Sequence, residues 1–172
     1  MQDFLNRMIA RLSQAQVEFV VVGGVSAVLQ GVPFVTLDLD LCYRRTPENI
    51  ARLAAALSPL KPRLRGFPSD LPFTFDERAI LLGTNFTLEV GDESLDLLGE
   101  MAAIGGYEEV ISHAEQVSVA GSPVKVLSLA QLIATKEAAG RQKDFAVLPL
   151  LKATLELKRK QSISAHESSS GN

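Results

Sequence analysis

The chain has 172 residues, of which 47% are hydrophobic and 22% are charged, so it has the size and composition of one globular domain. This composition excludes a disordered, collagen-like or low-complexity protein. The aromatic share of 6% and the net charge of −3 argue against a stacking platform for single-stranded nucleic acid and against a broad phosphate-tracking surface. The single cysteine, Cys42, excludes an internal disulfide framework and a cysteine-based zinc site, so a reducing cytoplasm is the expected location.

The sequence contains no stretch that resembles a signal peptide or a membrane span. Its most apolar window, residues 19–29, is followed by Gln30, Gly31 and Pro33 and falls short of the roughly 20 residues that cross a bilayer. We therefore expect a soluble protein with no membrane partner. Residues 61–115 carry four basic and eleven acidic side chains, whereas residues 127–160 carry seven basic and three acidic ones. These segments could meet at a cleft, or both could be ordinary solvated faces.

Helices and strands are predicted to alternate in the first part of the chain. Apolar residues at helical spacing, β-branched runs and the Thr46-Pro47 helix start predict these elements. They are helix 3–15, strand 17–22, helix 25–30, strand 36–43 and helix 47–58.

Hairpins and further helices are predicted in the second part. Residues 59–75 hold four prolines and predict a loop with a short edge strand near 63–67. The later elements are strands 85–90 and 95–98, helical turns in 106–113, a hairpin of 116–120 with 123–127, a helix from Ser128 to Ala139, and a helical segment 142–158 that is kinked or restarts at Pro149. The serine-rich segment 161–172 predicts a disordered tail, which leaves one domain over residues 1–160. The class is α+β, a mixed sheet with helices packed on it.

The most specific feature is the pair Asp38 and Asp40. Residues two apart on a strand share a face, so both carboxylates project together while Leu37, Leu39 and Leu41 face the core. Like charges repel in this position, and a divalent cation such as Mg²⁺ would offset the repulsion. An isolated Asp-x-Asp pattern is also compatible with a plain solvent-facing strand.

Two further features of the sequence, a glycine turn and a third carboxylate, favour the metal-site interpretation. Gly23-Gly24 lies between a strand and a helix, where backbone N–H groups can face a phosphate, although a plain tight turn has the same composition. Thirteen residues separate Gly24 from Asp38, enough for a short helix and a returning strand. A third carboxylate, Asp96, lies between apolar neighbours in a later strand. Carboxylates beside a phosphate-type turn outline a site for two-metal phosphoryl or nucleotidyl transfer.

The order Gly23-Gly24, Asp38-x-Asp40 and Asp96 resembles the polymerase-β-like nucleotidyltransferase superfamily. Within it, the chain resembles small bacterial nucleotidyltransferase-like proteins, including those of abortive-infection toxin–antitoxin systems. The segments 31–36, 126–136 and 141–144 support the resemblance, which spans roughly residues 4–158. It implies the nucleotidyltransferase fold, with a mixed and mostly antiparallel sheet.

The resemblance also implies roles for individual residues. Asp38 and Asp40 would hold two Mg²⁺ ions, and Asp96 would bind the catalytic ion and help to deprotonate an acceptor hydroxyl. Gly23 and Gly24 would receive the β- and γ-phosphates of a nucleoside triphosphate (NTP). Many members carry a serine at the position of Gly24, and Ser26 is the candidate substitute here.

Three basic residues are further candidates for binding the triphosphate, namely Lys136, Lys143 and Arg141. Lys136 could instead extend from the edge of the core. Asp144 is predicted as an ion-pair partner or a helix cap, and Arg44 and Arg45 as residues that could reach a nucleotide or remain on the surface.

The expected activity is transfer of a nucleoside monophosphate to a hydroxyl of an RNA end, tRNA included, of a protein or of a small molecule. The alternative is a non-catalytic or partner-dependent toxin–antitoxin subunit, whose partner protein is encoded nearby. A nucleotide sensor without turnover is a third possibility. Retention of the repelling carboxylates favours catalysis, and the lack of an acceptor-binding domain favours dependence on a partner.

Overall fold

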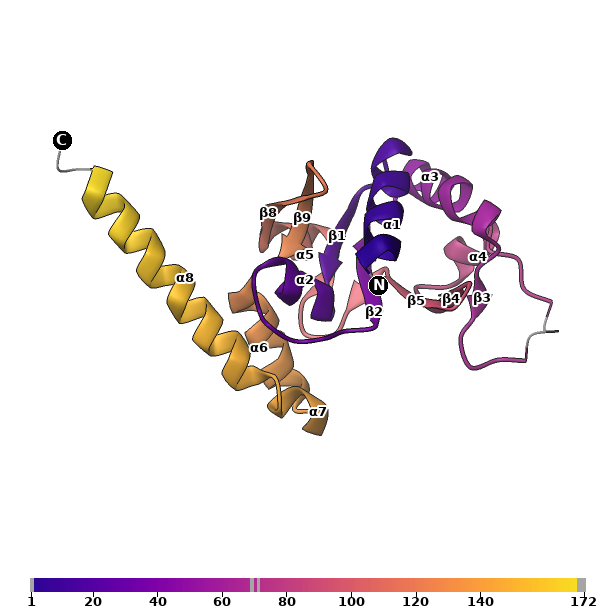
Figure 1. Ribbon diagram of the computed structural model, residues 1–172. Coiled ribbons are helices and arrows are strands. Elements are labelled where there is room, and N and C mark those ends of the chain that lie inside the picture. Colours follow the sequence, from indigo (N-terminus) through magenta and orange to yellow (C-terminus); the bar gives the residue numbers. More distant parts are fainter. Residues whose placement is uncertain (1, 69, 71, 170–172) are drawn as a thin grey trace.

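A seven-stranded mixed sheet organises the computed structural model, which describes residues 2–68, 70 and 72–169 (Figure 1). The helices are α1 (Gln2–Gln14), α2 (Gly23–Leu29), α3 (Pro47–Leu57), the 3-10 turn η1 (Ser58–Leu60), α4 (Glu77–Leu82), α5 (Tyr107–Ser112), α6 (Leu129–Ala139), α7 (Gln142–Phe145) and α8 (Leu148–Ser169). The strands are β1 (Phe19–Val22), β2 (Asp38–Tyr43), β3 (Arg63–Leu64), β4 (Asn85–Val90), β5 (Glu93–Leu98), β6 (Glu100–Met101), β7 (Gly105–Gly106), β8 (Ala114–Val119) and β9 (Ser122–Leu127).

The strand order across the large sheet is β3-β4-β5-β2-β1-β9-β8. Strand β2 pairs in parallel with β5, and β1 pairs in parallel with β9. The other neighbouring pairs are antiparallel. The predicted α+β class with a mixed, mostly antiparallel sheet is therefore confirmed. Strands β6 and β7 form a separate two-stranded sheet.

Helices cover both faces of the large sheet and enclose two cores. On one face, α1 and α3 pack over alternate residues of β2, including Leu39 and Leu41. On the other face, Cys42 packs in a second core to which α5, α6 and α8 contribute. Since side chains alternate along a strand, Asp38 and Asp40 lie on the face of Cys42. The alternation of β2 thus separates its apolar side from its acidic side.

Local signals in the sequence place several helix ends correctly. The Thr46 side chain accepts a hydrogen bond from the Asn49 backbone N–H, and Ser128 does the same for Gln131 at the start of α6. Gly140 ends α6 with φ of 59°, the left-handed conformation that favours glycine. Helix α8 begins at Leu148 with Pro149 in its first turn, so the predicted restart is confirmed.

Three predictions differ from the structure. Leu37 precedes β2 and is 72% exposed, so it does not face the core. Helix α4 was not predicted, although Asp76 caps it by accepting from the Ala79 backbone N–H. Helix α8 continues through Ser169, beyond residue 158 where the predicted helical segment ends.

The distal part of α8 has its own local hydrogen bonds. The hydroxyls of Ser162 and Ser164 donate to the backbone carbonyls of Lys158 and Lys160 one turn earlier, which is compatible with a helix despite the serine-rich composition. Figure 1 shows α8 extending away from the sheet beyond α6. None of the described helices combines the length and the apolar character that a bilayer crossing needs.

Candidate active site

Three carboxylates lie on one face of the sheet at neighbouring positions of two parallel strands. Asp40 in β2 is the register partner of Asp96 in β5, and Asp38 lies two residues before Asp40. Neighbouring strands run about 4.8 Å apart, so side chains at these positions interact. The fold therefore brings together the carboxylates predicted as metal ligands.

Arg65, which the sequence did not single out, lies between two of these carboxylates. It follows β3, and its backbone N–H donates to the Thr87 carbonyl in β4 at 2.9 Å. Its guanidinium donates to Asp38 Oδ1 at 3.0 Å and to Asp96 Oδ1 and Oδ2 at 2.9 and 3.1 Å. The Arg65 side chain thereby supplies a positive charge to the acidic face of the sheet.

The surroundings of Asp40 shift its pKa strongly. Burial raises the pKa of Asp40 to about 7 from its ordinary value of 3.8, and the charges of Asp96 and Asp38 act in the same direction. The positive charges of Arg65 and Lys136 lower the pKa of Asp40 and offset part of this effect. Negative charge is therefore costly at this point unless a cation compensates it.

At the start of α2, Gly23 lies against Asp40, and Gly24 lies against the segment that precedes β2. Gly23 has φ of +61°, and a Cβ at this residue would lie 2.0 Å from Asp40 Oδ2. A Cβ at Gly24 would lie 2.7 Å from the hydroxyl oxygen of Thr36. The turn consequently needs both glycines for its close approach to neighbouring side chains.

Basic residues of α6 and of the α7 region form the remaining part of the site. Lys136 in α6 forms an ion pair with Asp144 in α7, and the Asp144 side chain is only 9% exposed. Asp144 thus serves as an ion-pair partner, as predicted, while Arg141 is the residue at the start of α7. The backbone of Lys143 belongs to α7, but its side chain lies outside the described part of the chain.

These groups line one cleft with a volume of about 510 Å³. The lining residues are Val22, Gly23, Gly24, Phe34, Thr36, Asp38, Asp40, Arg65, Asp96, Leu98, Met101, Lys136, Arg141, Asp144 and Val147. Sequence reasoning missed Arg65 and Thr36. Thr36 could have been found from its position two residues before Asp38, whereas nothing in the loop composition around Arg65 indicates its role.

Some candidate residues do not reach the cleft. Ser26 is fully buried, its hydroxyl donates to the Gly23 carbonyl at 2.8 Å, and it is not among the lining residues. Arg44 pairs with Glu18 and Glu108 at the far end of β2. Arg45 donates to the Gly83 carbonyl at 2.7 Å and to the Tyr43 hydroxyl at 2.8 Å. Since the serine hydroxyl already has an acceptor within its own turn, its predicted contact with a phosphate is not available in this conformation.

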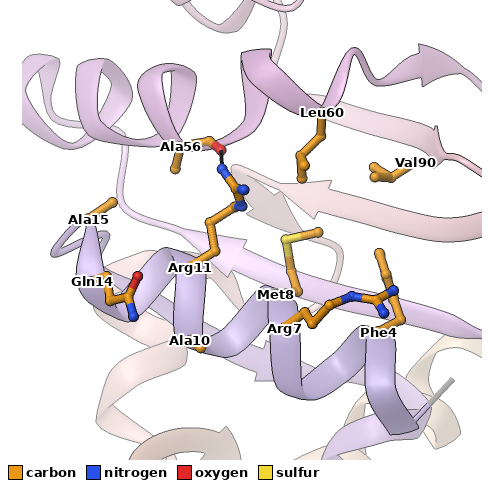
Figure 2. A pocket seen from close by; sticks show the side chains of 10 residues that line it. All are labelled: Phe4, Arg7, Met8, Ala10, Arg11, Gln14, Ala15, Ala56, Leu60 and Val90. Atoms are coloured by element: carbon orange, nitrogen blue, oxygen red, sulfur yellow. Dashed lines mark hydrogen bonds between the residues drawn. The ribbon is translucent and has the colours of Figure 1, made fainter.

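A larger groove lies elsewhere, between α1, α3 and β4 (Figure 2). It has a volume of about 660 Å³, and its charged lining residues are Arg7 and Arg11. Arg11 donates to the Ala56 carbonyl at 3.1 Å, as Figure 2 shows. Because no carboxylate or nucleophile lines this groove, the smaller acidic cleft is the candidate for chemistry.

The donor set of the cleft fits a hard divalent cation, since Mg²⁺ prefers carboxylate oxygens. As the side chains stand, no group of three or more Asp, Glu, His or Cys residues converges on one point anywhere in the described ranges. The guanidinium of Arg65 instead bridges Asp38 and Asp96. These two carboxylates therefore already bind a positive group, the guanidinium of Arg65.

Comparison with known proteins identifies the fold. No family model matches the chain, and no curated protein is significantly similar to it. Solved structures do match. The crystal structure of ANT(2")-Ia in complex with adenylyl-2"-tobramycin is 17% identical, with a TM-score of 0.61 over 99% of this chain and 98% of that one.

Two further structures share the fold. A Thermotoga maritima protein assigned as a nucleotidyltransferase is 20% identical, with a TM-score of 0.57 over 86% of this chain and 89% of that one. An antigenic nucleotidyltransferase-like protein from Paracoccidioides brasiliensis is 16% identical, with a TM-score of 0.53 over 91% and 75% of the two chains. The chain therefore has the fold of nucleotidyltransferases, which confirms the predicted resemblance at the level of the fold.

Proposed function

We propose that the protein is a Mg²⁺-dependent nucleotidyltransferase that moves a nucleoside monophosphate from an NTP to a hydroxyl acceptor. The observation that carries this proposal is the meeting of Asp38, Asp40 and Asp96 with the Gly23-Gly24 turn and Lys136 in one cleft. The carboxylates would hold cations, while the backbone N–H groups of the glycine turn, which contacts Asp40, and the ammonium group of Lys136 would bind phosphates. This arrangement suits a transfer in which the triphosphate spans the cleft.

The acidic residues are assigned to the reacting end of the nucleotide. Asp38 and Asp40 would hold two Mg²⁺ ions, with Asp96 as a ligand of the catalytic one. When bound, these ions would stabilise the negative charge that develops on the attacking and leaving oxygens. Asp96 would take the proton from the acceptor hydroxyl. A bond then forms between the acceptor oxygen and the α-phosphorus, the bond to the β-phosphate oxygen breaks, and pyrophosphate leaves.

The Gly23-Gly24 turn and the basic residues are assigned to the β- and γ-phosphates. The backbone N–H groups of Gly23 and Gly24 would face them, and Lys136, Arg141 and Lys143 would neutralise their charge. Lys136 is paired with Asp144, which fixes the direction of its side chain. We do not include Ser26, because its hydroxyl is already bonded inside α2. The dependence on NTP and Mg²⁺ is compatible with a cytoplasmic location.

A small molecule is the first acceptor to test. The ANT(2")-Ia complex contains an adenylylated small molecule, and that chain and this one match over almost their full lengths. RNA ends, tRNA and proteins are the other acceptors in the assay.

The experiment is transfer of label from α-³²P-labelled NTPs with Mg²⁺, supplied in parallel with small hydroxyl compounds, tRNA and a protein lysate. We expect the wild type to label one acceptor class, and Asp38→Asn and Asp40→Asn to abolish labelling. Asp92→Asn, in the exposed turn between β4 and β5, is the matched control and should label normally. No transfer by the wild type, or equal transfer by the variants, refutes the proposal.

A partner-dependent form of the same protein is the second candidate, as in a toxin–antitoxin pair. It is favoured by the extension of α8 beyond the body, where Leu157 and Ile163 are 59% and 60% exposed (Figure 1). Co-purification with the product of an adjacent gene, lost in a Leu157→Glu, Ile163→Glu double variant, supports this candidate. Transfer activity of the purified chain alone would contradict it.

A further inference from the structure

Arg65 uses the oxygen atoms that a divalent cation would need. Its two terminal nitrogens bond Asp38 and Asp96 separately, at 3.0 Å and at 2.9 to 3.1 Å. Charge-assisted bonds of this kind are about twice as strong as neutral ones. A metal ion that bound the same oxygen atoms would have to displace the guanidinium.

The location of Arg65 distinguishes it from an ordinary surface arginine. Arg63, two residues earlier in β3, pairs with Glu89 at 3.4 Å, and its side chain is 55% exposed. The Arg65 side chain is 30% exposed, lines the acidic cleft, and bonds an Asp96 side chain that is 17% exposed. Ion pairs that are partly shielded from water are stronger than exposed ones. The two arginines therefore provide a matched pair, one inside the site and one outside it.

The chain around Arg65 allows the guanidinium to move without unfolding the sheet. The backbone of Arg65 is held to β4 through its hydrogen bond to the Thr87 carbonyl. Gly66 follows with φ of +80°, so the chain turns away from the sheet immediately after Arg65. A long, flexible side chain on an anchored backbone can leave the carboxylates by rotation about its own bonds.

We propose that Arg65 is an internal counter-ion of the metal site, which occupies a cation position between Asp38 and Asp96 and competes with the divalent cation for it. The proposal rests on the proposed function only in its assumption that these carboxylates bind a metal. The competition lowers the affinity of the free protein for the cation, and the binding of the cation releases the guanidinium into the cleft.

The test is Mn²⁺ binding to the full chain without nucleotide, measured by electron paramagnetic resonance and calorimetry. Loss of the charge-assisted competitor in Arg65→Gln should raise the affinity for Mn²⁺ about tenfold. Arg65→Lys keeps the charge but loses the bidentate geometry, so its affinity for Mn²⁺ should lie between those of the wild type and Arg65→Gln. Arg63→Gln should leave the affinity unchanged. Thermal unfolding checks that each variant is folded, and Arg65→Lys replaces Arg65→Gln if the latter is not.

The outcomes separate this inference from the proposed function. If the wild type binds Mn²⁺ and folded Arg65 variants bind it equally or more weakly, the inference is wrong while the metal site stands. If the wild type and the folded Arg65 variants all fail to bind Mn²⁺, the inference and the metal part of the proposed function both fail. In the wild type, the ¹⁵N resonance of the Arg65 Nε–H group, assigned by its loss in the variant, should shift during Mg²⁺ titration. A resonance that does not move also overturns the inference.

Discussion

Gly23 lies directly against the carboxylate of Asp40: a Cβ on Gly23 would stand 2.0 Å from Asp40 Oδ2. The turn assigned to the phosphates and the strand assigned to the metal ions are therefore in contact. A change at the glycine must move the carboxylate, which links the two halves of the site through one pair of residues.

The first prediction uses this contact. Gly23→Ala should lower transfer activity about 100-fold, because displacement of a reacting group by about 1 Å has this effect. Gly91→Ala is the matched control: Gly91 also has a positive φ, of +63°, but a Cβ on it would meet no atom within 4 Å, and it lies outside the cleft. Both variants should lose about 1–2 kcal/mol of stability from the left-handed backbone. Equal activity of the two variants would contradict the contact.

The second prediction separates the structural role of Lys136 from its role toward phosphate. Lys136→Met leaves Asp144 buried without its partner and should lower the free energy of unfolding by about 2–4 kcal/mol. The double variant Lys136→Met, Asp144→Asn should recover much of this stability but no transfer activity. Chemical denaturation and the label-transfer assay measure the two effects. Recovery of activity together with stability would show that Lys136 has no role toward the nucleotide.

The third prediction concerns stability and pH in the metal-free protein. The pKa of Asp40 is about 7 in the folded chain, against 3.8 for the ordinary residue. Between these two pH values, Asp40 is therefore protonated in the folded state and ionised in the unfolded state. The free energy of unfolding should therefore fall as the pH rises from about 4 to 7, by a few kcal/mol. Asp40→Asn should remove this contribution. Denaturation curves across this pH range check the slope, and identical slopes in both proteins would refute the assignment.

The fourth prediction concerns Arg45, which lies outside the cleft. Arg45 bonds the Gly83 carbonyl at the end of α4 and the hydroxyl of Tyr43. Arg45→Met should cost about 2 kcal/mol of stability, because the part-buried Gly83 carbonyl and the Tyr43 hydroxyl lose a charged donor. Its KM for the nucleotide should stay within about twofold of the wild type, as a residue remote from the cleft makes no contact there. A large rise in KM without loss of stability would restore Arg45 as a nucleotide-binding candidate.

The sequence predicts the centre of the sheet well, because the evidence there is local. The alternation around Asp38 and Asp40 gives their shared face. Thr46 and Ser128 mark helix starts through side-chain oxygens that accept nearby backbone N–H groups, and Gly140 marks a helix end through its left-handed backbone. Asp96 could be selected for the same reason, since its strand alternates apolar and polar residues.

The remaining parts of the site depend on contacts between distant segments. Arg65 reaches Asp96 across 31 positions of the chain, from a proline-rich region for which the sequence predicts a loop with a short edge strand but no contact with the acidic residues. Ser26 is the candidate substitute for the serine that the resemblance implies, yet the helix begins at Gly23 and the Ser26 hydroxyl donates to the Gly23 carbonyl. Arg44 and Arg45 follow the acidic strand in sequence but lie at its opposite end. Of the two alternatives left open for Arg44 and Arg45, the structure favours a position outside the cleft.

The central claim is tested most directly by counting products in one reaction. With α-labelled NTP, Mg²⁺ and the acceptor found by screening, the wild type should release one pyrophosphate for each nucleotide attached. Asp96→Asn should slow both products at least about 100-fold, while Asp92→Asn should not. Pyrophosphate and labelled acceptor that form in unequal amounts, or at the wild-type rate in Asp96→Asn, would contradict a transfer that depends on the paired carboxylates of β2 and β5.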